Sequence, residues 1–349
     1  MKKKQLNRQQ LFRIQKIQNE HAARAGRRQT RSEEAIGHTE LGPEQAGIVI
    51  AHFGQQLDIE AREGDNKGRI FRCHQRTNLE PLVAGDRVIW QAGDPVGVVV
   101  ANLPRRTLLT RPSSFGDLRP VAANIDTLII VIAPLPQAYP NLIDRYLVAA
   151  EQIPVQPVIV LNKADLLTHD SRDELHKLLG LYQKIAYPVL QVSSKTLVGM
   201  PDLKALLNDR TSIVVGQSGV GKSALINALL PGVNTLEGEL SEGHEKGRHT
   251  TSSARLFHFP DGGDLIDSPG IREFGLWHLE PADVYAGFIE FRPYLGHCKF
   301  RDCRHELEPG CRLLQAVADG DIDPGRMASY RQILQSIQSD TSPAFPEND

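Results

Sequence analysis

Residues 216–223, with the sequence GQSGVGKS, constrain the fold of this 349-residue chain more than any other segment, because they match the phosphate-binding loop in full. The glycines let the backbone curl so that its N–H groups converge on a β-phosphate. An apolar strand pattern over 212–215 precedes the loop, and a helix pattern over 223–230 follows it, so the helix N-terminus faces the phosphates. The loop therefore predicts a nucleoside triphosphate site built from Gly216, Gln217, Ser218, Gly219, Val220, Gly221, Lys222, Ser223 and Ala224.

Two of these side chains have assigned roles in the predicted site. The Lys222 ammonium would reach the β and γ oxygens of the triphosphate, and the Ser223 hydroxyl would ligate Mg²⁺. Alternating strand and helix patterns surround the loop, which is typical of a parallel α/β sheet. The predicted strands are 127–133, 158–161, 189–192, 212–215 and 263–266, and the predicted helices are 142–152, 173–183, 202–207 and 223–230.

The base that the site accepts is indicated by a second motif, NKAD, at residues 162–165. The Asp165 carboxylate can accept hydrogen bonds from guanine N1–H and N2–H₂, a pair that adenine does not offer. Asn162 can bind the other edge of the base and brace the phosphate-binding loop, while the stem of Lys163 packs over the ring. Ala164 completes this motif, and Ser193, Ser194 and Lys195 resemble a weaker motif whose backbone amide contacts guanine O6.

A third element, DSPG at residues 267–270, follows a short predicted strand. Asp267 would hold Mg²⁺ through water, and the Gly270 amide would contact the γ-phosphate. A simple surface turn is the alternative interpretation of this segment. In ordinary small GTPases the phosphate-binding loop comes first and the guanine motif late, whereas here the guanine motif comes first. The sequence therefore predicts a circularly permuted GTPase whose motifs meet at the carboxyl edge of one sheet.

The N-terminal part of the chain contains two segments of different composition. Residues 1–31 contain ten lysines and arginines and a single acid, Glu20, which favours an unfolded arm that contacts a polyanion, although a solubilising tail would look the same. From residue 47 onward, five short strand patterns alternate with glycine-containing turns. This pattern predicts a small OB-like or SH3-like barrel. Its predicted strands are 48–53, 57–61, 69–75, 87–91 and 96–101.

Three cysteines and a histidine lie close together near the C-terminus, as Cys298, Cys303, His305 and Cys311. Three thiolates and one imidazole are a common tetrahedral Zn²⁺ set, usually structural when all four ligands come from protein. His297 is a competing ligand. The basic residues around the cluster favour a surface that contacts RNA, with a solvated charged surface as the alternative; they are Lys299, Arg301, Arg304 and Arg312.

The motif order, the N-terminal barrel, the segment GRHTT at 247–251 and the C-terminal cluster together resemble the circularly permuted, ribosome small-subunit-dependent GTPases of bacteria, RsgA or YjeQ. The resemblance covers nearly the whole chain. It implies an OB-fold barrel and GTP hydrolysis stimulated by the small ribosomal subunit. It also implies a late role in the maturation of that subunit, with rRNA binding and release on hydrolysis.

The residue that orients the attacking water is also inferred through this resemblance. Ile271, directly after the DSPG motif, can neither donate nor accept a hydrogen bond through its side chain, so intrinsic turnover should be slow. In the family this role is attributed to the histidine that aligns with His249. Thr251, or otherwise Thr250, would complete the Mg²⁺ shell in the GTP state.

The fold class expected from these features is multidomain α/β. We predict a basic arm over 1–44, an OB-like barrel over 45–112, a circularly permuted P-loop GTPase domain over 113–278 and a helical zinc-binding domain over 279–349. The longest apolar stretch, residues 128–135, is too short for a membrane span of about 20 residues. With no secretory signal and four cysteines, we expect a cytoplasmic protein. The sequence leaves its oligomeric state open, and a monomer is the simpler expectation.

Two other functions are compatible with parts of the sequence. A non-hydrolysing RNA-binding module could use GTP only to stabilise its fold. A metabolic kinase could use the phosphate-binding loop to phosphorylate a small molecule, but the guanine motif argues against it.

Overall fold

The computed structural model describes residues 41–54, 56–112, 117–231, 254–268, 276 and 278–340. These residues form two compact units, one of residues up to 82 together with 87–104, and one of residues 83–86 together with those from 105 onward. No helix among the described residues combines the length and apolarity that a membrane crossing requires.

The first unit is a five-stranded barrel. Strand β1 pairs with both β2 and β4, while β3 runs parallel to β5, so the strands close in the order β1-β2-β3-β5-β4. This closed Greek-key arrangement confirms the OB-like barrel. Trp90 is fully buried at its centre, and a glycine is required at position 47 beside it, because an added Cβ would lie 2.6 Å from the indole. The strands are β1 (Leu41–Phe53), β2 (Gln56–Ala61), β3 (Ile70–Gln75), β4 (Arg87–Gly93) and β5 (Gly97–Asn102).

Strand β1 is longer than the apolar pattern predicts. It begins at Leu41 instead of residue 48, and its polar first half pairs with β4 through Glu44 opposite Gln91 and Gln45 opposite Trp90. Backbone pairing therefore extends the strand where the side chains carry no hydrophobic signal.

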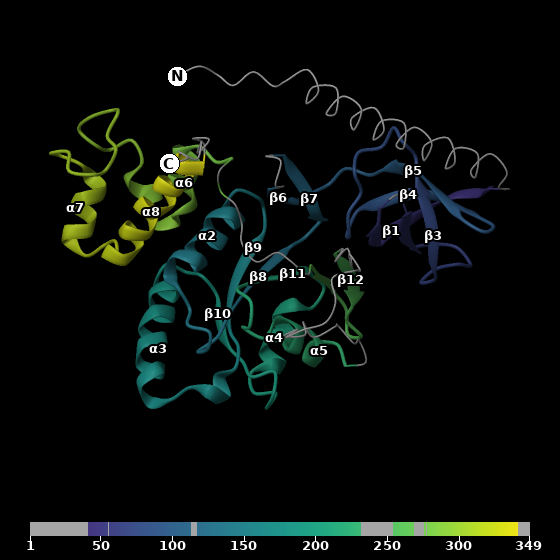
Figure 1. Ribbon diagram of the computed structural model, residues 1–349, viewed down its shortest axis with the longest axis horizontal. Coiled ribbons are helices and arrows are strands. Elements are labelled where there is room, and N and C mark those ends of the chain that lie inside the picture. Colours follow the sequence, from purple (N-terminus) through teal and green to yellow (C-terminus); the bar gives the residue numbers. More distant parts are fainter. Residues whose placement is uncertain are drawn as a thin grey trace, which may run out of the picture. The chain divides into compact units, whose positions relative to one another are not determined.

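The second unit contains a six-stranded sheet in the order β10-β9-β8-β11-β13-β12 (Figure 1). All neighbours are parallel except β12, which pairs antiparallel with β13 at the edge. The predicted parallel α/β sheet is confirmed. The strands are β8 (Thr127–Ile132), β9 (Gln156–Leu161), β10 (Val189–Gln191), β11 (Thr211–Val215), β12 (Arg255–His258) and β13 (Asp264–Asp267).

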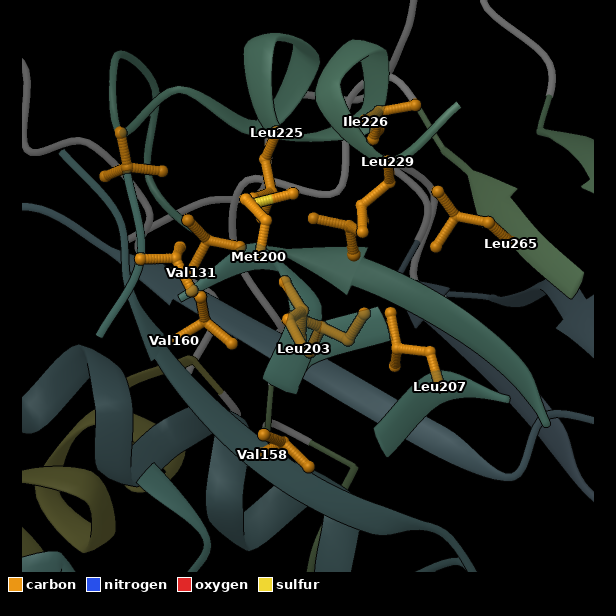
Figure 2. Packing of buried hydrophobic residues seen from close by; sticks show 14 of the residues in the cluster. Val131, Val158, Val160, Met200, Leu203, Leu207, Leu225, Ile226, Leu229 and Leu265 are labelled. Atoms are coloured by element: carbon orange, nitrogen blue, oxygen red, sulfur yellow. The ribbon is translucent and has the colours of Figure 1, made fainter. Parts of the chain in front are cut away.

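Helices α4 (Met200–Leu207) and α5 (Lys222–Leu229) cover one face of this sheet. Figure 2 shows leucines of both helices packed against valines of the central strands, Val131, Val158 and Val160. Because successive strand residues point to opposite faces, the alternate residues of β8 and β9 face the other side. Helix α2 (Pro140–Glu151) packs against these two strands, and α3 (His169–Lys184) follows β9 in the chain.

One part of this unit was not predicted from sequence. Strands β6 (Leu108–Pro112) and β7 (Leu118–Ala123) form an antiparallel hairpin across the boundary at 112 and 113 that was predicted between the barrel and the GTPase domain. The C-terminal region is helical, as the sequence predicts, and consists of α6 (Pro281–Gly287), η2 (Ile289–Tyr294), α7 (Arg312–Asp319) and α8 (Pro324–Asp340). Its core is aromatic, with Phe288 stacked on Phe291 and Tyr330 edge-on to both.

Candidate functional site

The predicted nucleotide motifs meet at one edge of the sheet. The guanine motif follows β9, its companion follows β10, the phosphate-binding loop follows β11, and Asp267 ends β13. These strands are parallel neighbours together with β8, so all of these segments emerge from the same carboxyl edge. This is the crevice in which open α/β sheets bind ligands.

The phosphate-binding loop has the backbone conformation that its glycines permit. Gly216, Gly219 and Gly221 have φ angles of 144°, 82° and 89°, and a Cβ on Gly216 would overlap the Val131 carbonyl oxygen. Gly221 is the N-cap of α5. The loop wraps around the Lys222 ammonium, which donates hydrogen bonds to the carbonyl oxygens of Gly216 at 2.7 Å and Gln217 at 2.8 Å.

Asn162 links three of the motifs. Its side chain is fully buried, and its Nδ2 donates to the Val220 and Gly221 carbonyl oxygens at 3.1 and 3.2 Å. Its Oδ1 accepts a hydrogen bond from the Ser194 amide at 3.1 Å. The expected bracing of the phosphate-binding loop is therefore present, and the same amide also holds the segment after β10.

Lys163 forms a second bridge between the guanine motif and the phosphate-binding loop. It adopts a left-handed backbone conformation with φ of 57°. Its Nζ donates to the carbonyl oxygen of Gly219 at 2.6 Å and to that of Leu135, in the loop after β8, at 3.0 Å. These two hydrogen bonds fix the orientation of the Lys163 side chain. A side chain that packs over a base needs such a fixed orientation.

Asp165 is exposed, and its carboxylate is oriented by a buried neighbour. The Ser193 hydroxyl donates to Asp165 Oδ1 at 2.5 Å, and Ser193 Oγ accepts from the Thr196 amide at 3.0 Å. The hydrogen bond from Ser193 lowers the pKa of Asp165 below its usual value, with smaller contributions from Lys195 and Lys163. The carboxylate therefore stays ionised, as an acceptor for guanine N–H groups must.

We expect Ser193→Ala to weaken guanine binding and selectivity by about fivefold, because one hydrogen bond that orients the carboxylate is lost. Its loss also raises the pKa of Asp165, so GTP affinity in the variant should begin to fall at a higher pH than in the wild type as the solution is acidified. Titration with GDP and ADP at pH 5 and pH 7 measures both effects. Unchanged affinities at both pH values would contradict this role for Ser193.

Asp267 lies beside the phosphate-binding loop, since β13 and β11 are neighbours with Ile266 opposite Ile213. Burial raises the pKa of the Asp267 carboxyl, and the nearby Lys222 ammonium partly offsets this effect. A divalent cation at this carboxylate and the Ser223 hydroxyl would favour the ionised form in the same way.

Several predicted site residues lie outside the part of the chain that the structure describes. They are His249, Thr250, Thr251, Gly270 and Ile271.

The C-terminal cysteines and histidine come together as the ligand spacing predicts. The ligand atoms of Cys298, Cys303, His305 and Cys311 all lie within 4.8 Å of one another. The Sγ atoms of Cys298 and Cys311 are 3.8 Å apart, and His305 Nδ1 is 3.6 and 3.3 Å from them. A tetrahedral ion with metal–sulfur bonds of about 2.3 Å would place two sulfurs about 3.8 Å apart. The donor set therefore fits a metal ion of this kind.

Two side chains outside the predicted ligand set hold the cluster's loop. Glu308 accepts hydrogen bonds from the backbone amides of Arg304, Glu306 and Leu307, which lower its pKa to about 2. Arg331 Nη2 donates to the His305 carbonyl oxygen at 2.9 Å. A glutamate three residues after the histidine ligand is a local signal that could have been found, whereas the Arg331 contact could not.

Comparisons with known proteins agree with this arrangement. A family model described as RsgA GTPase matches residues 102–277. A protein of Azotobacter vinelandii named small ribosomal subunit biogenesis GTPase RsgA is 58% identical over 338 residues, which cover 97% of this chain and 98% of that protein.

Two solved structures have the same fold over most of the chain. The crystal structure of YjeQ from Thermotoga maritima matches with a TM-score of 0.70 and 31% identity, covering 85% of this chain and 99% of that one. The structure of YloQ, described as a circularly permuted GTPase, matches with a TM-score of 0.68 and 28% identity, covering 87% and 98%. Family model, full-length relative and permuted strand order agree, and the chain belongs to the RsgA family of circularly permuted GTPases.

Proposed function

We propose that this GTPase acts as a late assembly factor of the small ribosomal subunit, and that the subunit stimulates its GTP hydrolysis. The names of its full-length relatives support this role. In this proposal the protein binds rRNA in the GTP state and leaves the subunit after hydrolysis. Such a factor would work as a monomer in the cytoplasm, where small subunits mature, with GTP, GDP and the subunit as partners.

The observation that most supports the nucleotide site is the buried Asn162, because one side chain joins the guanine motif, the phosphate-binding loop and the Ser194 segment. In the proposed site, Asp165 accepts from guanine N1–H and N2–H₂, and the Lys163 stem covers one face of the ring. The Ser194 and Lys195 backbone approaches guanine O6.

The phosphates and Mg²⁺ would be bound at the phosphate-binding loop, which Asn162 joins to the guanine motif. Lys222 would contact the β and γ oxygens, and the loop amides through Ala224 would surround the β-phosphate. Ser223, Asp267 and Thr251 would hold Mg²⁺, which neutralises charge that develops on the phosphates. His249 would orient the attacking water.

We further propose that the Cys298, Cys303, His305 and Cys311 cluster binds one Zn²⁺ with a structural role. Three thiolates and one imidazole suit zinc, and four protein ligands leave no open position for chemistry. The cationic side chains on this loop, among them Lys299 and Arg304, would contact rRNA phosphates in a salt-dependent way.

The ribosomal part of this proposal is tested by measuring GTP hydrolysis with purified small subunits, with large subunits and with neither. We expect turnover to rise by orders of magnitude with small subunits only. The bound subunit would supply a missing catalytic group or stabilise the active conformation of the switch segment. Equal rates in all three mixtures would leave the fold unaffected and contradict the ribosomal role. A single-turnover rate of zero in every mixture would instead favour the non-hydrolysing RNA-binding module.

We expect His249→Ala to retain GTP affinity and to lose subunit-stimulated turnover by about 100-fold, within the usual range for a group that handles a proton or positions water. Ile271, beside the γ-phosphate motif, provides no side-chain hydrogen bond that could compensate. Nucleotide titration and single-turnover hydrolysis with small subunits measure the two effects separately. The comparison variant is His176→Ala, a change on helix α3. Full stimulated turnover in His249→Ala would remove this residue from the mechanism.

A further inference from the structure

Helix α2 begins at the nucleotide site. It follows the loop after β8, where the Leu135 carbonyl oxygen accepts a hydrogen bond from Lys163 at 3.0 Å. Because Lys163 Nζ also donates to the Gly219 carbonyl oxygen at 2.6 Å, this loop is tied to both nucleotide motifs. Gln217 and Val220 of the phosphate-binding loop share a small cavity of about 10 Å³ with the first turns of α2. A change in either nucleotide loop therefore acts directly on the start of this helix.

Along its length, the same helix is bound to the C-terminal helices by polar contacts. Asn141 Nδ2 donates to Ser329 Oγ at 3.0 Å, and Arg145 Nη2 donates to Ser336 Oγ at 2.6 Å, both on α8. At the far end, Glu151 pairs with Arg292 at 2.6 Å. The two contacts with α8 lie in the first half of α2, so these helices cannot slide past one another without breaking them, whereas the Glu151 pair joins the last turn of α2 to η2.

The centre of this interface is a buried ion network around Arg326 of α8. The Arg326 side chain is only 2% exposed and pairs with Asp144 of α2 and with both carboxylate oxygens of Glu290. Its guanidinium lies 4.3 Å from the centre of the Phe288 ring. Tyr182 of α3 donates to Asp144 Oδ1 at 2.7 Å. A planar guanidinium held by two carboxylates fixes one relative orientation of the two helices, because any other leaves a buried charge unpaired.

Helix α8 also contacts the metal cluster, one turn after Arg326. Arg331 donates to the His305 and Glu306 carbonyl oxygens at 2.9 and 3.0 Å. Tyr330 packs edge-on against Tyr285, whose ring centre is 5.2 Å from that of His305. A displacement of α8 therefore displaces the backbone that carries a metal ligand.

From these contacts we infer that helix α2 transmits the nucleotide state of the GTPase site to the metal cluster, and that Arg326 is the residue that couples the two. The inference rests on the guanine-nucleotide and metal assignments proposed above, but not on the ribosomal role. Coupling of this kind is reciprocal, so the factor by which the nucleotide changes metal affinity is also the factor by which the metal changes nucleotide affinity. The chain of packed side chains and ion pairs provides the physical connection that such coupling requires.

The inference is tested by the rate at which the metal is released to an excess of a chromogenic chelator. The rate is measured without nucleotide, with GDP and with a non-hydrolysable GTP analogue. In the wild type we expect the rates with and without the analogue to differ by at least about fivefold, the lower end of usual coupling. In R326Q the ratio should fall close to one, and R326K should give an intermediate ratio because it keeps the charge without the planar fork. R292Q, which removes an exposed pair at the same interface, should keep the wild-type ratio.

R326Q leaves Asp144 and Glu290 facing each other, so D144N/R326Q is measured beside it, with metal content and melting temperature as checks on folding. A ratio of one in the wild type would overturn the inference, and so would a wild-type ratio in a folded R326Q or D144N/R326Q. Neither result depends on ribosomal subunits. A failure of the ribosomal role would instead appear only in the hydrolysis assay with small and large subunits.

Discussion

Replacing Asn162 with alanine should weaken guanine-nucleotide binding by about 100-fold or more. The substitution leaves the Val220 and Gly221 carbonyl oxygens and the Ser194 amide without the partner they have now. An unpaired buried polar group costs about 1–3 kcal/mol, and about 1.4 kcal/mol is a factor of ten in affinity. The three segments that Asn162 joins would no longer be held in place in the free protein, so part of the binding free energy would be spent on ordering them. Calorimetric titration with GDP measures this loss.

Two further variants separate this effect from a general loss of stability. Asn162→Asp keeps an acceptor for the Ser194 amide but places oxygen against two carbonyl oxygens, so it should bind nucleotide as weakly as the alanine variant. Asn208→Ala changes an exposed asparagine at the end of α4 and should bind GDP normally. Wild-type affinity in Asn162→Ala would show that the three segments are held together in another way.

Loss of one cysteine ligand should abolish metal binding and unfold the loop around the cluster. Structural zinc sites provide roughly 10–16 kcal/mol of apparent binding free energy in isolated fingers. Burial, and hydrogen bonds to the neighbouring thiols, raise the pKa of Cys303 to about 12, so without a metal this side chain is a neutral thiol. We expect Cys298→Ser to contain less than a tenth of the wild-type metal and to exchange the amides of residues 298–311 rapidly.

The aromatic core of Phe288, Phe291 and Tyr330 does not depend on the metal ligands, so this unfolding should be local. Guanine-nucleotide binding should therefore persist, with its affinity changed only by the factor that couples the nucleotide site to the metal cluster. Cys73→Ala is the matched control: Cys73 is buried in the core of the barrel and is not one of the four predicted ligands, so the variant should contain wild-type metal. Equal metal content in wild type and Cys298→Ser would contradict the ligand assignment.

Metal affinity should also decrease as pH falls, because the cysteine thiols must lose their protons to bind the metal.

The strands of the sheet were predictable because burial on both faces produces continuous apolar runs. Residues 127–133, with the sequence TLIIVIA, predict a strand that the structure places at Thr127–Ile132. The β6–β7 hairpin was not predicted because its strands contain Pro112 and Pro120, residues that sequence patterns associate with the ends of strands.

The permuted order and the common edge of the motifs also followed from sequence. The bracing role of Asn162 could be predicted because the chemistry of its amide requires partners on both sides. In contrast, the hydrogen bond of Ser193 to Asp165 and the network of Arg326 depend on contacts between separate segments. Arg326 and Asp144 are 182 positions apart, and no local pattern distinguishes a buried arginine from a solvated one on a helix such as α8.

The most direct test of the guanine site is the nucleotide preference of wild type and Asp165→Asn for GTP, XTP and ATP. An aspartate accepts from N1–H and N2–H₂ of guanine, whereas an asparagine accepts at N1–H and donates to the oxygen that xanthine carries at C2. The wild type should therefore prefer GTP, Asp165→Asn should prefer XTP, and both should bind ATP weakly. Preference of the wild type for ATP, or an unchanged preference for GTP in Asp165→Asn, would contradict the assignment of these loops to one guanine-nucleotide site.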